Sequence, residues 1–233
     1  MNLLLAQPIL ALLLQAPATE PAAAPPSADE IMARLEAADL ARRQSMTGYV
    51  SVREYSVENQ RFHVRASMQV EVTVEKTGQK HFRILKTSGP AAVRKLVFQR
   101  MLDTEQRASD PASQAANRIS RANYTFRLAG SGEIDGRKHY ILEAEPKSEN
   151  PLLFRGRVWI DATHYAVARI EGAPARNPSF WVKKTSFVHE NAEFNGQWLP
   201  RRNRSDSQIR IFGRSTTTIV YGDPTPPSAA GTP

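Results

Sequence analysis

The chain has 233 residues, of which 41% are hydrophobic and 23% charged, and it carries a formal net charge of +8. This composition indicates a globular protein of one large domain or two small ones, and the basic excess suits either anionic partners, such as phospholipid headgroups or nucleic acid, or a surface of scattered arginines. Cysteine is absent, which excludes disulfide bonds, thiolate metal sites, a cysteine nucleophile and a lipid anchor on an N-terminal cysteine.

The N-terminus has the pattern of an export signal. Residues 3–14 form a mostly apolar run that is shorter than the roughly 20 residues of a membrane-spanning helix. Small residues at A-x-A spacing follow at 16–18, although no Lys or Arg precedes Arg34. We predict a signal peptide over residues 1–18, a disordered Pro/Ala-rich linker over 19–26, and export of the domain that follows.

The first element of the folded domain is predicted to be a helix. Residues 27–30 read S-x-x-E, the capping box that begins many helices. Ile31, Leu35 and Ala38 then share one helical face, and the helix should end before Gly48.

Long β-strands are predicted next. Residues 49–57 form one strand, and seven inward positions then alternate without a break at Phe62, Val64, Ala66, Met68, Val70, Val72 and Val74. Strands usually have about 3–10 residues, so a strand of this length should twist and bend, which favours a barrel-like sheet. After a turn at Thr77-Gly78, Phe82 and Ile84 resume the alternation.

A helical insertion interrupts the strands. Pro90 suits the start of a helix, whose apolar stripe would be Val93, Leu96, Val97 and Met101. A second helix should begin at Asp110-Pro111 and run to about residue 119. Helices in this position usually cover one face of an antiparallel sheet.

The remaining chain predicts a β-meander. The expected strands cover 124–128, 140–144, 154–160, 165–171, 179–190, 197–201 and 207–221, with turns at 130–136 and 161–164. The folded domain would therefore span residues 27–222, and residues 223–233 would be a disordered tail. Apolar side chains on the long strand and on the helices would line either a ligand groove or an ordinary dry core.

Motifs for covalent chemistry are missing. The sequence has no G-x-S-x-G, H-E-x-x-H, P-loop or G-x-G-x-x-G motif, and no two of its five histidines stand at metal-ligand spacing. We therefore expect no enzymatic activity, no metal and no cofactor. Glu143 and Glu145 on one side of a strand would be an acid and base pair for a hydrolase, or simply two solvated carboxylates. Residues 180–184 offer the one match to a nucleic-acid stacking surface, although Trp181 fits a core or groove position better.

The order of the elements, together with the strand Phe154-Arg-Gly-Arg-Val-Trp-Ile-Asp161, resembles the periplasmic LolA/LolB-like superfamily of lipoprotein carriers, which sort lipoproteins to the outer membrane. Further marks of the resemblance are the return strand at 165–170, Asn177-Pro-Ser-Phe-Trp181 and Trp198-Leu-Pro200. The resemblance covers about residues 31–222. It implies a mainly β fold with helices, an incomplete, half-open antiparallel β-barrel covered by a helical lid.

The resemblance also implies a function. The chain would be a monomeric periplasmic carrier or chaperone that binds acyl chains of lipoproteins or other lipids in an apolar groove, with transient contacts to envelope membrane proteins and none to nucleic acid. The alternative is an RseB-like sensory or regulatory binding module. In the family, a strand arginine bonds to the lid, and Arg83 is the candidate for this lid contact. The expected lipid-binding residues are Val64, Met68, Val70, Val72, Phe82, Ile84, Val93, Leu96, Val97, Met101 and Leu142.

Overall fold

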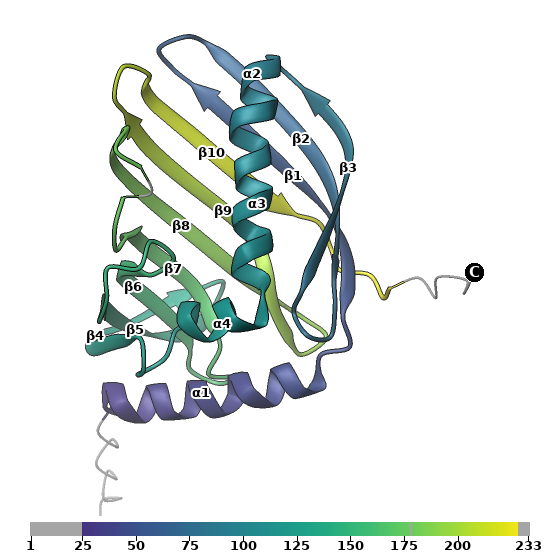
Figure 1. Ribbon diagram of the computed structural model, residues 1–233. Helices are drawn as coiled ribbons and strands as arrows, with labels where there is room; N and C mark the ends of the chain where they lie inside the picture. The colour runs from purple at the N-terminus through teal and green to yellow at the C-terminus, as the bar shows by residue number, and fades with distance from the viewer. Residues whose placement is uncertain (1–24, 178, 228–233) are drawn as a thin grey trace, which may run out of the picture.

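The computed structural model describes residues 25–177 and 179–227 and shows one ten-stranded antiparallel sheet. The sheet order is β3-β2-β1-β10-β9-β8-β7-β6-β5-β4, and the sheet curves without closing into a barrel (Figure 1). Its strands are β1 (Tyr49–Asn59), β2 (Val64–Val74), β3 (Lys80–Ser88), β4 (Tyr124–Ile134), β5 (Arg137–Pro146), β6 (Phe154–Asp161), β7 (Val167–Pro174), β8 (Val182–Phe194), β9 (Gln197–Ile209) and β10 (Gly213–Tyr221). The expected half-open antiparallel sheet with covering helices is confirmed. The predicted signal peptide and most of the predicted linker lie outside the described residues.

Helix α1 (Ala28–Ser45) crosses one end of the sheet (Figure 1). The predicted capping box begins it: the backbone N–H of Glu30 donates to the Ser27 hydroxyl, and the Glu30 carboxylate accepts the Ser27 N–H at 2.7 Å. Ile31, Met32 and Leu35 are buried in an apolar cluster with strands β4 to β6. No helix in the described part of the chain is long and apolar enough to cross a membrane.

A second helical segment lies across the concave face of the sheet (Figure 1). It consists of α2 (Ala91–Val93), the π-helical turn η1 (Arg94–Phe98) and α3 (Gln99–Ser109), and we call residues 91–109 the covering helix. Helix α4 (Pro111–Asn117) follows it and begins at the predicted proline. Both helices of the predicted insertion are therefore present.

Strand β2 has the alternation that its sequence predicts. Its buried residues are Ala66, Met68, Val70, Val72 and Val74. Phe62 and His63, which were expected to extend this strand, lie in the β1–β2 turn, where His63 adopts a positive φ of 50°.

Several strands are longer than predicted, and β4 and β9 are the most instructive. Strand β4 continues to Ile134 past a bulge between Leu128 and Gly130, so most of the predicted turn at 130–136 is strand. Strand β9 runs unbroken over 13 residues, although only its start at 197–201 was predicted. Polar and charged side chains occupy both of its faces, so no hydrophobic alternation marks it.

The predicted disordered tail begins with an ordered contact. Thr225 and Val50 exchange two backbone hydrogen bonds of 2.9 Å in an isolated β-bridge. The ordered chain therefore continues past residue 222.

The concave face has two apolar clusters instead of one continuous apolar groove. One joins α1 to β4–β7, and the other joins the covering helix to β1 and β2. A row of register partners crosses four strands as Asn59, Ser215, Ser207 and Thr185, near the end of the sheet that carries the β1–β2 turn. Asn59 Nδ2 donates to Ser215 Oγ at 2.7 Å, and the hydroxyls of Ser207 and Thr185 are 2.9 Å apart. The concave face is therefore polar along this row.

Candidate functional site

The candidate site is the apolar cluster beneath the covering helix. Phe98 and Leu102 of the helix are buried against Tyr55 of β1 and the inward residues of β2. Seven of the eleven predicted lipid-binding residues belong to this cluster, namely Met68, Val70, Val72, Phe82, Val93, Val97 and Met101. The alternation of β2 and the apolar stripe of the helix thus identify side chains that the fold brings together.

The other four predicted residues lie elsewhere or at the margin. Leu142 is fully buried in the apolar cluster that joins α1 to β4–β7. Val64 is half-buried at the start of β2. Ile84 and Leu96 are 50% and 54% exposed, because Ile84 is on the edge strand and Leu96 lies off the buried side of the helix.

An open depression lies where the covering helix meets β2 and β3. Its volume is about 370 Å³, and its lining residues include Met68, Ile84 and Phe98, with Arg94 and Lys95 among the others. Small-molecule sites typically have volumes of about 300–1,000 Å³ and mostly apolar walls. The depression therefore has the size and lining of a small apolar site with a basic margin.

A buried ion pair fixes the covering helix to the sheet. Arg53 Nη1 of β1 lies 2.8 Å from Glu105 Oε2 of α3, and the Arg53 side chain is only 1% exposed. The Tyr55 hydroxyl donates to Glu105 Oε1 at 3.0 Å, and Lys80 Nζ of β3 donates to Glu105 Oε2 at 3.2 Å. One carboxylate of the helix is thus held by three side chains of two strands.

The electrostatics of this contact favour its charged form. Burial alone would raise the pKa of the Glu105 carboxyl, but the charges of Lys80 and Arg53 outweigh it, and the pKa is lowered. Burial raises the pKa of the Tyr55 hydroxyl, and the neighbouring carboxylate adds to the effect. Arg53 also lies 4.8 Å from the ring centroid of Tyr221 on β10, in a cation–π contact.

Arg83, the predicted lid contact, lies elsewhere. Its guanidinium donates to both carboxylate oxygens of Glu71 on β2, at 2.9 and 2.8 Å, and its side chain is 69% exposed. Arg53 contacts the covering helix instead. The sequence does contain a signal for this: Arg53 stands between Ser51 and Tyr55 at an inward position of an alternating strand, where a charged residue needs a buried partner.

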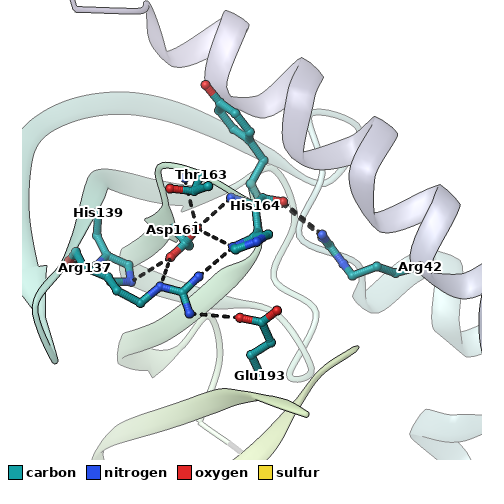
Figure 2. Close-up of polar contacts among 8 residues, drawn as sticks. Arg42, Arg137, His139, Asp161, Thr163, His164 and Glu193 are labelled. Atoms are coloured by element: carbon teal, nitrogen blue, oxygen red, sulfur yellow. Dashed lines mark hydrogen bonds and ion pairs between the residues drawn. The ribbon is translucent and has the colours of Figure 1, made fainter. Parts of the chain in front are cut away.

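Sequence reasoning also missed a second buried polar cluster, at the end of β6 (Figure 2). Asp161 is fully buried, and its Oδ1 accepts the backbone N–H groups of Thr163 and His164 at 3.0 and 2.7 Å. Its Oδ2 lies 3.0 Å from Nε of Arg137, whose Nη1 donates to Glu193 of β8 at 2.9 Å. Burial would raise the pKa of Asp161, but these backbone donors and Arg137 outweigh it and lower the pKa. The cluster joins the β6–β7 turn to β5 and β8.

The two carboxylates considered for hydrolysis are engaged in ion pairs. Glu143 pairs with Arg127, and Glu145 lies 3.1 Å from Arg155. All four side chains line a shallow depression of about 430 Å³ over β4, β5 and β6. No group of three or more His, Asp or Glu side chains that would hold a metal ion occurs among residues 25–177 and 179–227.

Comparisons with known proteins concern the fold alone. No protein-family model and no curated protein sequence matches the chain. Solved structures that are similar to it include a LolA superfamily protein from Nitrosomonas europaea, with 12% identity, a TM-score of 0.43, and coverage of 87% of this chain and 94% of that chain. A DUF1329 family protein from Desulfovibrio piger is 14% identical, with a TM-score of 0.48, and the match covers 86% of this chain and 93% of that chain. A domain assigned to outer membrane lipoprotein sorting, from Vibrio parahaemolyticus, is 11% identical, with a TM-score of 0.46, and the match covers 86% of this chain and 94% of that chain.

Proposed function

We propose that the chain binds an acyl chain of a lipid or lipoprotein between the covering helix and strands β1–β3, and carries it through the periplasm towards the outer membrane. The observation that carries this proposal is the incomplete burial of the apolar cluster. Met68 and Val70 are buried beneath the helix, whereas Ile84 remains half exposed in the lining of an open depression. A surface of this kind gains stability when an apolar ligand covers it.

The energetics suit a long, flexible apolar ligand. Burial of one CH₂ group contributes about 0.8 kcal/mol, so six of them contribute about 5 kcal/mol. Part of this gain is offset by the ordering of the ligand. An acyl chain is the biological ligand that supplies many CH₂ groups in a row, and the basic Arg94 and Lys95 suit a negatively charged group at its polar end.

A carrier must also release its ligand, and the covering helix provides a movable element. The polar contact at Glu105 holds the helix near its C-terminal end, while its first half is held by apolar contacts of Val93 and Val97 and by one exposed hydrogen bond, from Arg94 to Thr87 at 3.3 Å. Apolar contacts are non-directional, so we expect the first half of the helix to move away from β2 without breaking the contact at Glu105. The role that the resemblance implies for Arg83 is proposed here for Arg53.

The test is to purify the protein from the periplasm and to analyse its organic extract by mass spectrometry. We expect a co-purified acyl lipid near a stoichiometry of one, and its loss in Ile84→Glu, which places a charge in the lining of the depression. Leu40→Glu is the matched control, since Leu40 is equally exposed but belongs to α1. An extract without lipid, or equal lipid in both variants, would contradict the proposal.

A further inference from the structure

Large apolar side chains gather at one end of the sheet. They come from the β1–β2 turn, the segment before β8 and the β9–β10 turn. We call them the tip surface, and their exposed fractions are 50% for Phe62, 76% for Phe180, 53% for Trp181, 65% for Ile211 and 51% for Phe212. Since β8, β9, β10, β1 and β2 include four neighbouring antiparallel pairs, these three connections emerge at the same end.

Direct contacts join the three connections into one surface. The rings of Phe62 and Phe212 lie edge to face with centroids 5.8 Å apart. Arg61 Nη1 donates to the carbonyl of Ile211 at 2.7 Å. Arg210 Nε donates to the carbonyl of Phe180 at 3.1 Å, and its guanidinium lies 4.6 Å from the centroid of that ring. The tip surface is therefore continuous from β2 to β8.

Basic residues surround these apolar side chains. The segments 58–65, 176–184 and 208–214 contain seven basic residues and one acidic residue, a net charge of +6. The basic residues are Arg61, Arg65, Arg176, Lys183, Lys184, Arg210 and Arg214. The acidic residue is Glu58, and its carboxylate lies 3.4 Å from Arg65; Asp206, just outside these segments, lies 3.5 Å from Arg214.

We propose that the tip surface docks on a bilayer that contains anionic phospholipid. Exposed aromatic side chains insert at the boundary between headgroups and acyl chains, and Lys and Arg bind the lipid phosphates. Charge complementarity selects this partner over a second copy of the chain, because two tip surfaces would bring equal positive charges together. Ile211 also lacks the flat face that base stacking on nucleic acid needs.

The docking end also contains the start of the covering helix. In Figure 1, α2 lies at the same end of the molecule as the β1–β2 and β9–β10 connections. Gly89, which leads into α2, lies so close to Ala66 of β2 that a Cβ at Gly89 would be 2.6 Å from the Ala66 Cβ. Docking would therefore bring the bilayer near the half-exposed Leu96. The inference concerns the surface alone, and it stands whether or not the depression holds a lipid.

The experiment is flotation of the purified full chain with vesicles of phosphatidylcholine alone or mixed with phosphatidylglycerol. We expect flotation with the anionic vesicles, about fivefold weaker affinity for each of Lys183→Gln and Lys184→Gln, and release by high salt. Phe180→Ser combined with Trp181→Ser should abolish flotation, and Leu40→Ser on α1 should leave it unchanged. Brominated lipid should quench the fluorescence of the wild type, and Trp181→Phe should lose this quenching, since Trp159 and Trp198 lie outside the tip surface.

Three results would overturn the inference. One is flotation of the Phe180/Trp181 variant at the wild-type level. Another is a dimer in size-exclusion chromatography that this variant abolishes while neither protein binds vesicles. The third is tip-dependent binding of a single-stranded oligonucleotide without vesicle binding. Circular dichroism of each variant checks the fold, and lipid content measured in the same preparations separates this outcome from that of the carrier proposal.

Discussion

Arg53 and Glu105 form an ion pair, with 2.8 Å between Nη1 and Oε2, that ties a buried strand residue to the helix above it. Glu105→Ala would leave the Arg53 charge in an apolar interior without its carboxylate. Removal of one partner of a buried pair typically costs about 3–5 kcal/mol. We expect a loss of this size in the free energy of unfolding from urea titrations, together with faster amide exchange over residues 91–109.

Two further variants test whether the loss of stability depends on the burial of the pair. Tyr55→Phe removes one hydrogen bond to the same carboxylate and should cost about 1.5–3 kcal/mol. Glu71→Ala removes the half-buried partner of the exposed Arg83 and should cost less than about 1 kcal/mol. Equal losses for Glu105→Ala and Glu71→Ala would mean that the buried pair does not hold the covering helix.

Burial separates a folding defect from a binding defect. Val70 is fully buried in the cluster, so Val70→Glu places an unpaired charge in the core and should destabilise the fold by about 4 kcal/mol or more. Ile84→Glu changes a half-exposed residue of the depression and should leave the Tm within about 3 °C of the wild type. Thermal unfolding followed by circular dichroism distinguishes the two, and a large Tm loss in Ile84→Glu would mean that its loss of lipid is a folding defect.

His189 makes stability depend on pH. Burial lowers the pKa of its imidazole, against a hydrogen bond with Asn191 that raises it. The unfolded chain therefore binds more protons than the folded chain between the lowered pKa and about 6.5, so stability falls as the pH falls through this window. Unfolding free energies from about pH 5 to about 7.5 should show this slope.

The matched variant for that slope is His189→Gln, which keeps a polar side chain beside Asn191 and Asn203. It should flatten the pH dependence above about pH 5, where the carboxyls of Glu105 and Asp161, with their lowered pKa values, stay ionised. An unchanged slope would assign the effect to another group.

Gly89 controls the entry into the covering helix. It has a φ of +97°, and a Cβ there would lie 2.7 Å from the Arg65 carbonyl oxygen. Gly89→Ala should therefore cost more than the roughly 1–2 kcal/mol of a positive φ alone. Gly136→Ala measures the cost of a positive φ alone, because Gly136 has a φ of +77° and no atom lies within 4 Å of its Cβ position. Equal losses in the two variants would exclude a steric role for the contact with β2.

The sequence was most informative where one face of an element is apolar. The alternation in β2 and the stripe at Val93 and Val97 predicted side chains that meet in one cluster, since burial imposes those periods. Strand β9 was largely missed, because its neighbours supply the packing and its own faces are polar. Tertiary pairing places such a strand, and local sequence does not record it.

The polar contacts of the site depend on long-range geometry. Arg53 and Glu105 are 52 residues apart, so spacing along the chain does not pair them. Arg83 was chosen from a short resemblance, whereas the register Glu71↔Arg83 gives it a partner on the adjacent strand. Leu142 had the right hydrophobicity but packs with α1, because strands β10 to β6 separate its strand, β5, from β1 in the sheet order.

The last strand in the sequence, β10, pairs with the first, β1. Paired residues such as Tyr55 and Ile219 are therefore separated by most of the chain. The segment from β1 to the covering helix is able to collapse early during synthesis, because its contacts are local. The sheet joins this segment to β4–β9 only after β10 has been synthesised. Closing a loop of this length is slow. A destabilising substitution in β10 should therefore leave two parts of the chain that are each partly folded and do not pair with each other.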